Sequence, residues 1–453
     1  MMRFVLFAII SVLIGCVVSN NLGQMSNRYG KVKIEKSTQR IGVPSIGKEY
    51  LMNGDFVDSG FPIIDGLNVF SESDDSSEIS AFTQIKSVSG IQMVAPNCFQ
   101  CHADSLNGEY ILGLGNTSFD FTIDMSFATQ FFKNTVQSKF GIGSKEWTAS
   151  LPFVRAMEAT TPHIQTEVVG SNPADKLAAV LAAHRNPEDL TWRTTPGIPI
   201  PKEVVPADPP AWWLLKKKNA MFTTAVGRGD FARLMMASSL LTLQDTVKAR
   251  QVDNHFVDVL SFINTIEAPS YPNNINHQLS SVGEIIFNNK CSSCHGTYGS
   301  KPEYPNLLVD ISLVKTDSLL AVSNFAYTEF VGWYNGSWFS KGKNKAYLQP
   351  GHGYVAPPLD GVWATAPYFH NASVPTISQV LNSAERPTYW SKSSSSFEYD
   401  FEKLGWKFRE FDQKIDKYTF DTTLPGYRNE GHYFGDKLSH DDRAAVLEYL
   451  KTL

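Results

Sequence analysis

The stretches "NCFQCHADSL" (residues 97–106) and "KCSSCHGTYG" (residues 290–299) share one pattern, Cys-x-x-Cys-His. The chain of 453 residues has five cysteines, and four of them lie in these two stretches. The first set is Cys98, Cys101 and His102, and the second is Cys291, Cys294 and His295. A pattern that recurs with identical spacing indicates one chemistry that uses all three side chains at both places.

Three kinds of site use paired cysteines. A disulfide or a redox dithiol leaves the histidine after each pair unexplained. A zinc site of four thiolates needs both pairs together, although they are 193 residues apart, counting from Cys98 to Cys291. Covalent haem attachment uses every residue, because two sulfurs bond to one porphyrin and the histidine binds its iron as proximal ligand. The sequence therefore predicts two covalently bound c-type haems.

The N-terminus, "MMRFVLFAIISVLIGCVVSN", predicts export. One arginine precedes an apolar run from Phe4 to Gly15, which is typical of a signal peptide and too short to span a bilayer comfortably. The run ends in Leu-Ile-Gly-Cys, which resembles a bacterial lipoprotein box with Cys16 as the lipidated residue. Ordinary secretion is the alternative. We expect the mature protein in the periplasm or cell envelope, attached to a membrane through lipid on Cys16.

Composition and helix signals predict the domain organisation. The chain is 42% hydrophobic and 12% aromatic, which is sufficient for a large core. Its net charge of −5, with basic residues scattered apart from 216–218, argues against a nucleic-acid partner. The expected units are a lipoprotein signal peptide (1–15), an N-terminal arm (16–80), a first haem domain (81–268) and a second haem domain (269–453).

Each expected haem domain contains amphipathic helix signals. One helix precedes the second motif, with Val282, Ile285 and Ile286 at helical spacing. Another ends the first domain at Pro269, and the last begins after Ser439 as N-cap. The predicted fold is therefore mainly α, with two class I cytochrome c-like helical domains, long loops and an irregular N-terminal arm.

The stretch "APPLDGVWATAPYFHNASVPTISQVL" (356–381) resembles the signature of bacterial di-haem cytochrome c peroxidases and their relatives, which include the methylamine-pathway di-haem enzyme and the di-haem rubber oxygenases. Two further stretches, "GYRNEGHYFG" (426–435) and "DPPAWWLLKKKNAMF" (208–222), are more similar to the rubber-oxygenase branch. The resemblance covers most of residues 90–453.

The resemblance implies a di-haem oxidoreductase. One haem would activate peroxide or O2, and the other would store or deliver electrons. A small redox protein or a quinol-linked donor would supply those electrons. A di-haem electron carrier without catalysis and a rubber-oxygenase-like dioxygenase are the alternatives.

The second haem needs a further iron ligand if it only transfers electrons. All ten methionines lie at or before Met236, so histidines downstream of the second motif are the candidates. We expect His440, beside the N-cap of the last helix, to be solvated. By resemblance, His432 matches the distal ligand of the rubber-oxygenase branch and His370 has a supporting catalytic role. His432 is therefore the predicted ligand, with His352 and His370 as alternatives, and by resemblance the first haem is the open one.

The resemblance also implies a tryptophan that relays electrons, or holds a radical, between the haems. Trp213, with Trp212 beside it, is the first candidate for this catalytic role, and Trp363 competes for it. The chain has nine tryptophans, so a purely packing role for this pair is the alternative.

Overall fold

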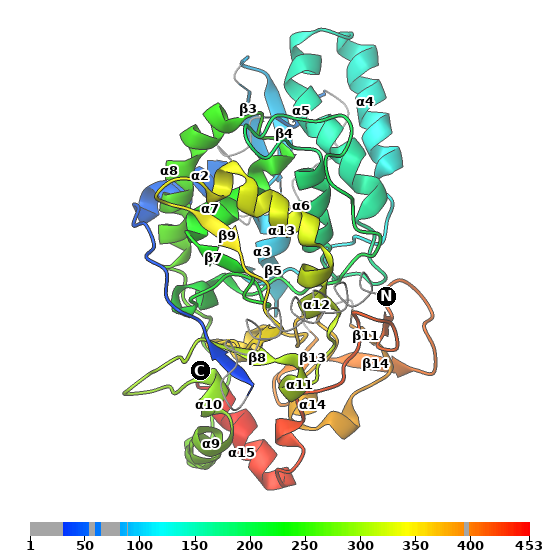
Figure 1. Cartoon of the computed structure of the whole chain (residues 1–453). Helices are drawn as coiled ribbons and strands as arrows, with labels where there is room; N and C mark the ends of the chain where they lie inside the picture. Colours follow the sequence, from blue (N-terminus) through cyan, green and yellow to red (C-terminus); the bar gives the residue numbers. More distant parts are fainter. Residues whose placement is uncertain (1–29, 54–58, 65–81, 88, 394–397) are drawn as a thin grey trace, which may run out of the picture.

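The computed structural model describes residues 30–53, 59–64, 82–87, 89–393 and 398–453 (Figure 1). The expected signal peptide, Cys16 and much of the expected arm lie outside these ranges. Within them, no helix combines the length and the apolar character that crossing a bilayer requires.

The helices lie mostly in two parts of the molecule. Figure 1 shows α2 and α3 to α8 in its upper part, and α9, α10 and α15 at the lower end. The longer helices are α2 (Pro44–Asn53), α4 (Ser126–Phe140), α5 (Lys145–Thr160), α6 (Ala174–Ala183), α8 (Thr246–Ile263), α9 (His277–Lys290), α12 (Leu319–Ala326), α13 (Thr328–Gly336) and α15 (His440–Leu450). The short ones are α3 (Phe99–His102), α7 (Phe231–Met235), α10 (Ser292–His295), α11 (Ile311–Val314) and α14 (Ile377–Leu381).

The strands of the described ranges form six small sheets, and every pairing between them is antiparallel. Three sheets have three strands each: β1 (Lys31–Lys33), β8 (Leu307–Asp310) and β10 (Gly353–Val355); β2 (Phe61–Pro62), β4 (Gln92–Pro96) and β3 (Phe82–Lys86); β14 (Phe408–Phe411), β11 (Tyr389–Lys392) and β15 (Phe420–Asp421). The two-stranded sheets are β5 (Ala103–Leu106) with β6 (Glu109–Leu112), β7 (Gly227–Gly229) with β9 (Ala346–Leu348), and β12 (Tyr399–Asp400) with β13 (Gly405–Trp406).

The prediction of a mainly α fold with two cytochrome-like helical domains is wrong. The structure is 40% helical and 15% strand, a mixed α/β arrangement. Between the helices, short runs such as "QMVAP" and "YWSK" pair as strands. Aromatic and β-branched residues favour such pairing, and the 24 prolines and 31 glycines keep the runs short. The expected domain boundaries stay predictions.

Two large hydrophobic clusters make up most of the core. The first cluster surrounds α3 and includes Met93, Phe99, Trp212, Met236, Phe256, Trp333 and Phe339. The second cluster lies around α9 and α15 and includes Trp213, Phe287, Trp363, Trp406 and Tyr449. The adjacent residues Trp212 and Trp213 therefore belong to different clusters.

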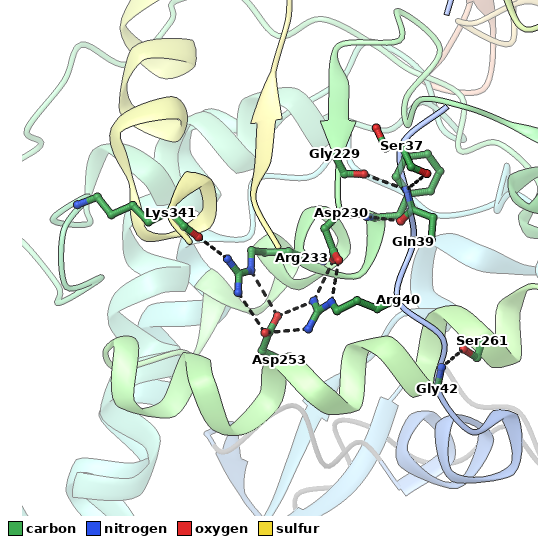
Figure 2. Close-up of polar contacts among 11 residues, drawn as sticks. Ser37, Gln39, Arg40, Gly42, Gly229, Asp230, Arg233, Asp253, Ser261 and Lys341 are labelled. Atoms are coloured by element: carbon green, nitrogen blue, oxygen red, sulfur yellow. Dashed lines mark hydrogen bonds and ion pairs between the residues drawn. The ribbon is translucent and has the colours of Figure 1, made fainter. Parts of the chain in front are cut away.

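The described part of the expected arm contains β1, α2 and β2 rather than being irregular, and Arg40 connects it to Asp230 and Asp253 (Figure 2). Its guanidinium donates two hydrogen bonds to Asp230, of 2.7 and 2.9 Å, and two of 2.9 Å to Asp253. Arg233 also contacts Asp253, at 3.2 Å. Two carboxylates and two guanidiniums thus hold the arm across α7 and α8.

The three helices expected from the sequence are present. The last one, α15, begins after Ser439, whose hydroxyl accepts a 3.1 Å hydrogen bond from the Asp442 amide as expected of an N-cap. Helix α9 runs to Lys290, directly before the second motif. Helix α8 ends at Ile263, several residues before Pro269.

Helix α9 packs on α15 through a small residue. A Cβ on Gly283 would collide with the carbonyl oxygen of Ala445, so the two backbones approach only because position 283 is glycine. Phe287 lies on the same buried face, whereas Val282 and Ile285, from the expected apolar pattern, are exposed.

Candidate functional site

The first Cys-x-x-Cys-His motif forms a single helical turn between β4 and β5. The Asn97 side chain accepts a 2.8 Å hydrogen bond from the Phe99 amide and starts this turn. The His102 amide donates to the Cys98 carbonyl at 3.0 Å. Because one turn carries all three motif residues, both sulfurs and the imidazole lie close together.

Residues distant in the sequence surround this turn. The indole of Trp212 stacks on the imidazole of His102, with ring centroids 5.0 Å apart and planes 28° apart. Asn172 donates its side-chain amide to Cys101 Sγ at 3.2 Å. Gly113 holds Trp212 in place, because its amide donates to the His102 carbonyl and its carbonyl accepts from the Trp212 amide. None of these partners follows from the motif alone.

The first motif lies deep in the protein. Burial raises the pKa of Cys98 to about 12 and also raises that of Cys101, so both sulfurs favour an uncharged form. Burial lowers the pKa of His102 to about 4, and its Nδ1 is buried without a hydrogen-bond partner among the described residues. Each of the three residues is nevertheless partly accessible to solvent. Uncharged sulfur and neutral imidazole fit a covalently attached haem.

The second motif continues directly from α9. The Cys291 amide donates to the Phe287 carbonyl at 2.8 Å, and the His295 amide donates to the Cys291 carbonyl at 3.1 Å. The side chain of His295 is oriented by Pro357, whose carbonyl lies 2.9 Å from His295 Nδ1. A proton on Nδ1 leaves Nε2 free to bind a metal. Burial, the largest influence, lowers the pKa of His295, which favours this neutral form.

The imidazole of His432 lies opposite that of His295. Their ring centroids are 6.2 Å apart and their planes are inclined by 62°. Two metal–nitrogen bonds of about 2 Å each, plus the distance from each ring nitrogen to its ring centre, come to about 6 Å. Burial, with smaller contributions from His295 and Arg386, lowers the pKa of His432 to about 3, so this imidazole is also neutral. The pair fits an iron held between two histidines.

Tight backbone contacts place His432 there. The residue itself has a left-handed φ of 50°, and its amide donates to the Val314 carbonyl at 2.7 Å. Gly431 before it has a φ of 83°, and a Cβ at this position would collide with the backbone of Lys315 and Thr316. The loop therefore needs glycine next to the histidine.

The two alternative histidines lie elsewhere. His352 is 51% exposed and its Nδ1 lies 3.3 Å from Asp310. His370 stacks on Tyr354 with ring centroids 3.9 Å apart, and its Nε2 is buried without a partner in the described ranges. Of these candidates, His432 is the one whose ring contacts His295. His440 is exposed, as expected.

The two motifs do not form one joint site. None of their four cysteines is in a disulfide, and nowhere in the described ranges do three or more His, Cys, Asp or Glu side chains come together as a metal-binding group. The four-thiolate zinc alternative therefore does not fit this structure.

Trp213 links the second cluster to the surroundings of the second motif. It is 1% exposed and donates its indole N–H to the Asp360 carbonyl at 2.8 Å. Pro357, three residues before Asp360, is the residue that orients His295. Trp363, the competing candidate, instead bonds to the Pro269 carbonyl and packs edge-on against Tyr271. The catalytic roles of Trp213 and His370 stay predictions.

Several partners of the motifs were not predicted from the sequence. Their positions come from backbone pairing between distant segments, such as the bridge of Asn172 with Ala207. The signal that could have drawn attention to Pro357 and Arg386 is their position in, or close to, the 356–381 signature. Asn172 has no comparable signal.

Comparison with known families gives a match for part of the chain. Residues 353–391 match a family described as RoxA-like, cytochrome c-like. This segment contains Pro357, Trp363, His370 and Arg386, but neither Cys-x-x-Cys-His motif. The match indicates a haem-binding cytochrome with covalently bound haem, and it supports the rubber-oxygenase-like branch only loosely. The relationship to the peroxidases stays a prediction.

Two proteins of Sinorhizobium fredii are similar to parts of the chain. "Uncharacterized protein y4iJ" is 42% identical over 123 residues, which are 25% of this chain and 20% of that protein. "Uncharacterized protein y4iM" is 25% identical over 195 residues, which are 38% of this chain and 44% of that protein. The chain therefore spans less than half the length of either relative.

Proposed function

We propose that the protein is an exported di-haem c-type cytochrome that acts as an oxidoreductase. The observation that carries the proposal is the opposition of His295 and His432 at 6.2 Å. It supports a second centre closed by two histidines. Haem iron, when bound, supplies a one-electron redox centre and, where a coordination position is open, a binding position for peroxide or O2.

The chain's own residues divide the work between the two motifs. Cys98 and Cys101 would hold one haem, and Cys291 and Cys294 would hold the other. His102 would be an iron ligand at the first centre, and His295 and His432 would be the iron ligands at the second. Only the first centre would then leave a position open for peroxide or O2.

In this proposal the tryptophan pair would connect the two centres for electron transfer. Trp212 stacks on His102, and the adjacent Trp213 donates to the carbonyl of Asp360. Three residues before Asp360, the carbonyl of Pro357 is hydrogen-bonded to the imidazole of His295. These contacts support a continuous route of stacked rings, peptide bonds and hydrogen bonds. His370, stacked on Tyr354, has a supporting role beside this route.

Two measurements on the matured protein test the proposal. Mass spectrometry under denaturing conditions should give the chain plus two haems. Carbon monoxide should bind one of the two reduced haems, because one position is open and the other is closed by His432. Binding to neither haem would favour a plain electron carrier, and a single haem would contradict the proposal. Consumption of peroxide or of O2, measured with a reduced donor, identifies the oxidant.

Location is part of the proposal and is tested separately. The lipoprotein box supports attachment of the protein to a membrane through Cys16. Cys16→Ser should move the protein from the membrane fraction to the soluble fraction of the envelope and leave its haem content unchanged. Wild-type protein already in the soluble fraction would contradict the anchor without contradicting export.

A further inference from the structure

Arg386 is a largely enclosed guanidinium whose hydrogen bonds all go to backbone carbonyl oxygens. Its Nη1 donates to the carbonyls of Asn429 and Gly431, at 2.7 Å in each case. Its Nε donates to Gln379 at 2.9 Å, and its Nη2 donates to Val380 at 3.2 Å. One side chain therefore connects α14 to the segment that ends immediately before His432.

The rings around Arg386 belong to the same site. The guanidinium lies 5.0 Å from the ring centroid of Phe369 and 5.9 Å from that of Tyr433. Phe369 is in turn 6.0 Å from the ring of His432. Arg386 thus contacts the residues on both sides of His432 and a ring that packs against it.

The planar, forked shape of the guanidinium fits this arrangement of carbonyl oxygens. Four donors in one plane satisfy four carbonyls that belong to two segments, and a lysine ammonium could not reach them in the same geometry. Burial lowers the pKa of Arg386 to about 10, against the raising influence of Asp436 and Tyr433, so the side chain stays positively charged at neutral pH. This positive charge lies at the carbonyl of Gly431, the residue directly before His432.

We propose that Arg386 is a positioning residue that holds His432 opposite His295 and that its charge raises the reduction potential of this centre. The inference rests on the proposed function of His432 as an iron ligand. The charge effect follows from electrostatics, because a nearby positive charge stabilises the reduced form, which carries one positive charge less.

Two substitutions separate the effect of the hydrogen-bond geometry of the guanidinium from the effect of its positive charge. Arg386→Gln removes both. We expect part of the second centre to change from low spin to high spin and to take up carbon monoxide, and the midpoint potential of the low-spin remainder to fall. Arg386→Lys retains the charge but loses the planar set of donors. Ligation by His432 should therefore weaken, while the midpoint potential should stay closer to that of the wild type. Added imidazole should restore the low-spin spectrum in both variants, which shows that the centre is intact.

Arg428→Gln is the matched control. Arg428 lies in the same loop, is about half exposed, and its side chain contacts Glu430 at 3.7 Å. Loss of its charge should leave the spin state and the potential of the second centre unchanged. An equal fall in potential for Arg428→Gln would show that any charge in this region acts alike and would overturn the specific role of Arg386.

His432→Ala, measured in parallel, distinguishes the two possible failures. If His432→Ala opens the second centre but Arg386→Gln changes neither spin state nor potential, the inference is overturned and the proposed function stands. If His432→Ala leaves the centre closed, the proposed function fails. Should Arg386→Gln not accumulate as folded protein, Arg386→Lys decides, and an unchanged spin state in that variant would overturn the positioning role.

Discussion

The indole of Trp212 stacks on the imidazole of His102, while its neighbour Trp213 packs in the second hydrophobic cluster. Two adjacent side chains thus reach the surroundings of both motifs. The backbone of this pair is held from one side by the Gly113 carbonyl, and the indole of Trp213 is held from the other by the Asp360 carbonyl. These contacts are the basis of the proposed relay between the two sites.

Trp213→Phe tests this coupling. The substitution keeps an aromatic ring but removes the N–H that donates to Asp360. We expect slower electron exchange between the two centres, measured by flash photolysis of the carbon monoxide complex, with unchanged spectra of each centre. Trp363→Phe is the comparison, because Trp363 bonds to Pro269 instead. A larger effect from Trp363→Phe would transfer the relay role to that residue.

His432→Ala tests the second ligand of the second centre. We expect one low-spin signal to become high spin and carbon monoxide to bind both reduced haems, with covalent attachment intact. His352→Ala is the control, since His352 is exposed and lies beside Asp310. An unchanged low-spin signal in His432→Ala would return the assignment to His370 or His352.

Gly283→Ala tests the close approach of α9 and α15. The added methyl group would collide with the Ala445 carbonyl, so we expect a loss of about 1–3 kcal/mol in the free energy of unfolding. Gly332→Ala is the matched control in α13, where a Cβ meets no atom within 4 Å. Because alanine favours a helix over glycine, this control should gain about 0.5–1 kcal/mol. Urea unfolding of both variants measures the difference, and equal effects would refute the packing argument.

His370→Phe tests a pH dependence of stability. Burial lowers the pKa of His370 to about 3, whereas an unfolded histidine titrates near its ordinary value of about 6.5. Between these values the unfolded chain binds one proton more than the folded chain, so stability falls as the pH falls, by about 1.4 kcal/mol per pH unit.

The variant removes this contribution but keeps an aromatic ring against Tyr354. Between pH 6.5 and pH 5 the wild type should therefore lose about 2 kcal/mol more than His370→Phe. The measurement is the free energy of urea unfolding at each pH. If it falls equally in both proteins as the pH falls, His370 takes up its proton as readily in the folded state as in the unfolded state, which would contradict the prediction.

Local patterns in the sequence predict the elements whose chemistry is local. The two motifs, the helix before the second motif and the N-cap of α15 depend on residues within a few positions of one another, and the structure contains all of them. The fold class was predicted wrongly, because strands such as β11 are stabilised by partners in β14 and β15 rather than by their own sequence. The exposed Val282 and Ile285 show the same limit, since α15 selects the buried face of α9.

By itself the sequence determined which side chains can attach a haem and which histidines remain as ligands, since these depend on residue type and short spacing. The resemblance already implied His432 as the ligand. The tertiary structure alone decided that its ring meets that of His295, that Trp212 lies on His102, and that Arg386 joins α14 to the His432 loop. Each of these contacts joins segments far apart in the chain. Their geometry depends on the packing and hydrogen bonding of the whole molecule, which no local pattern encodes.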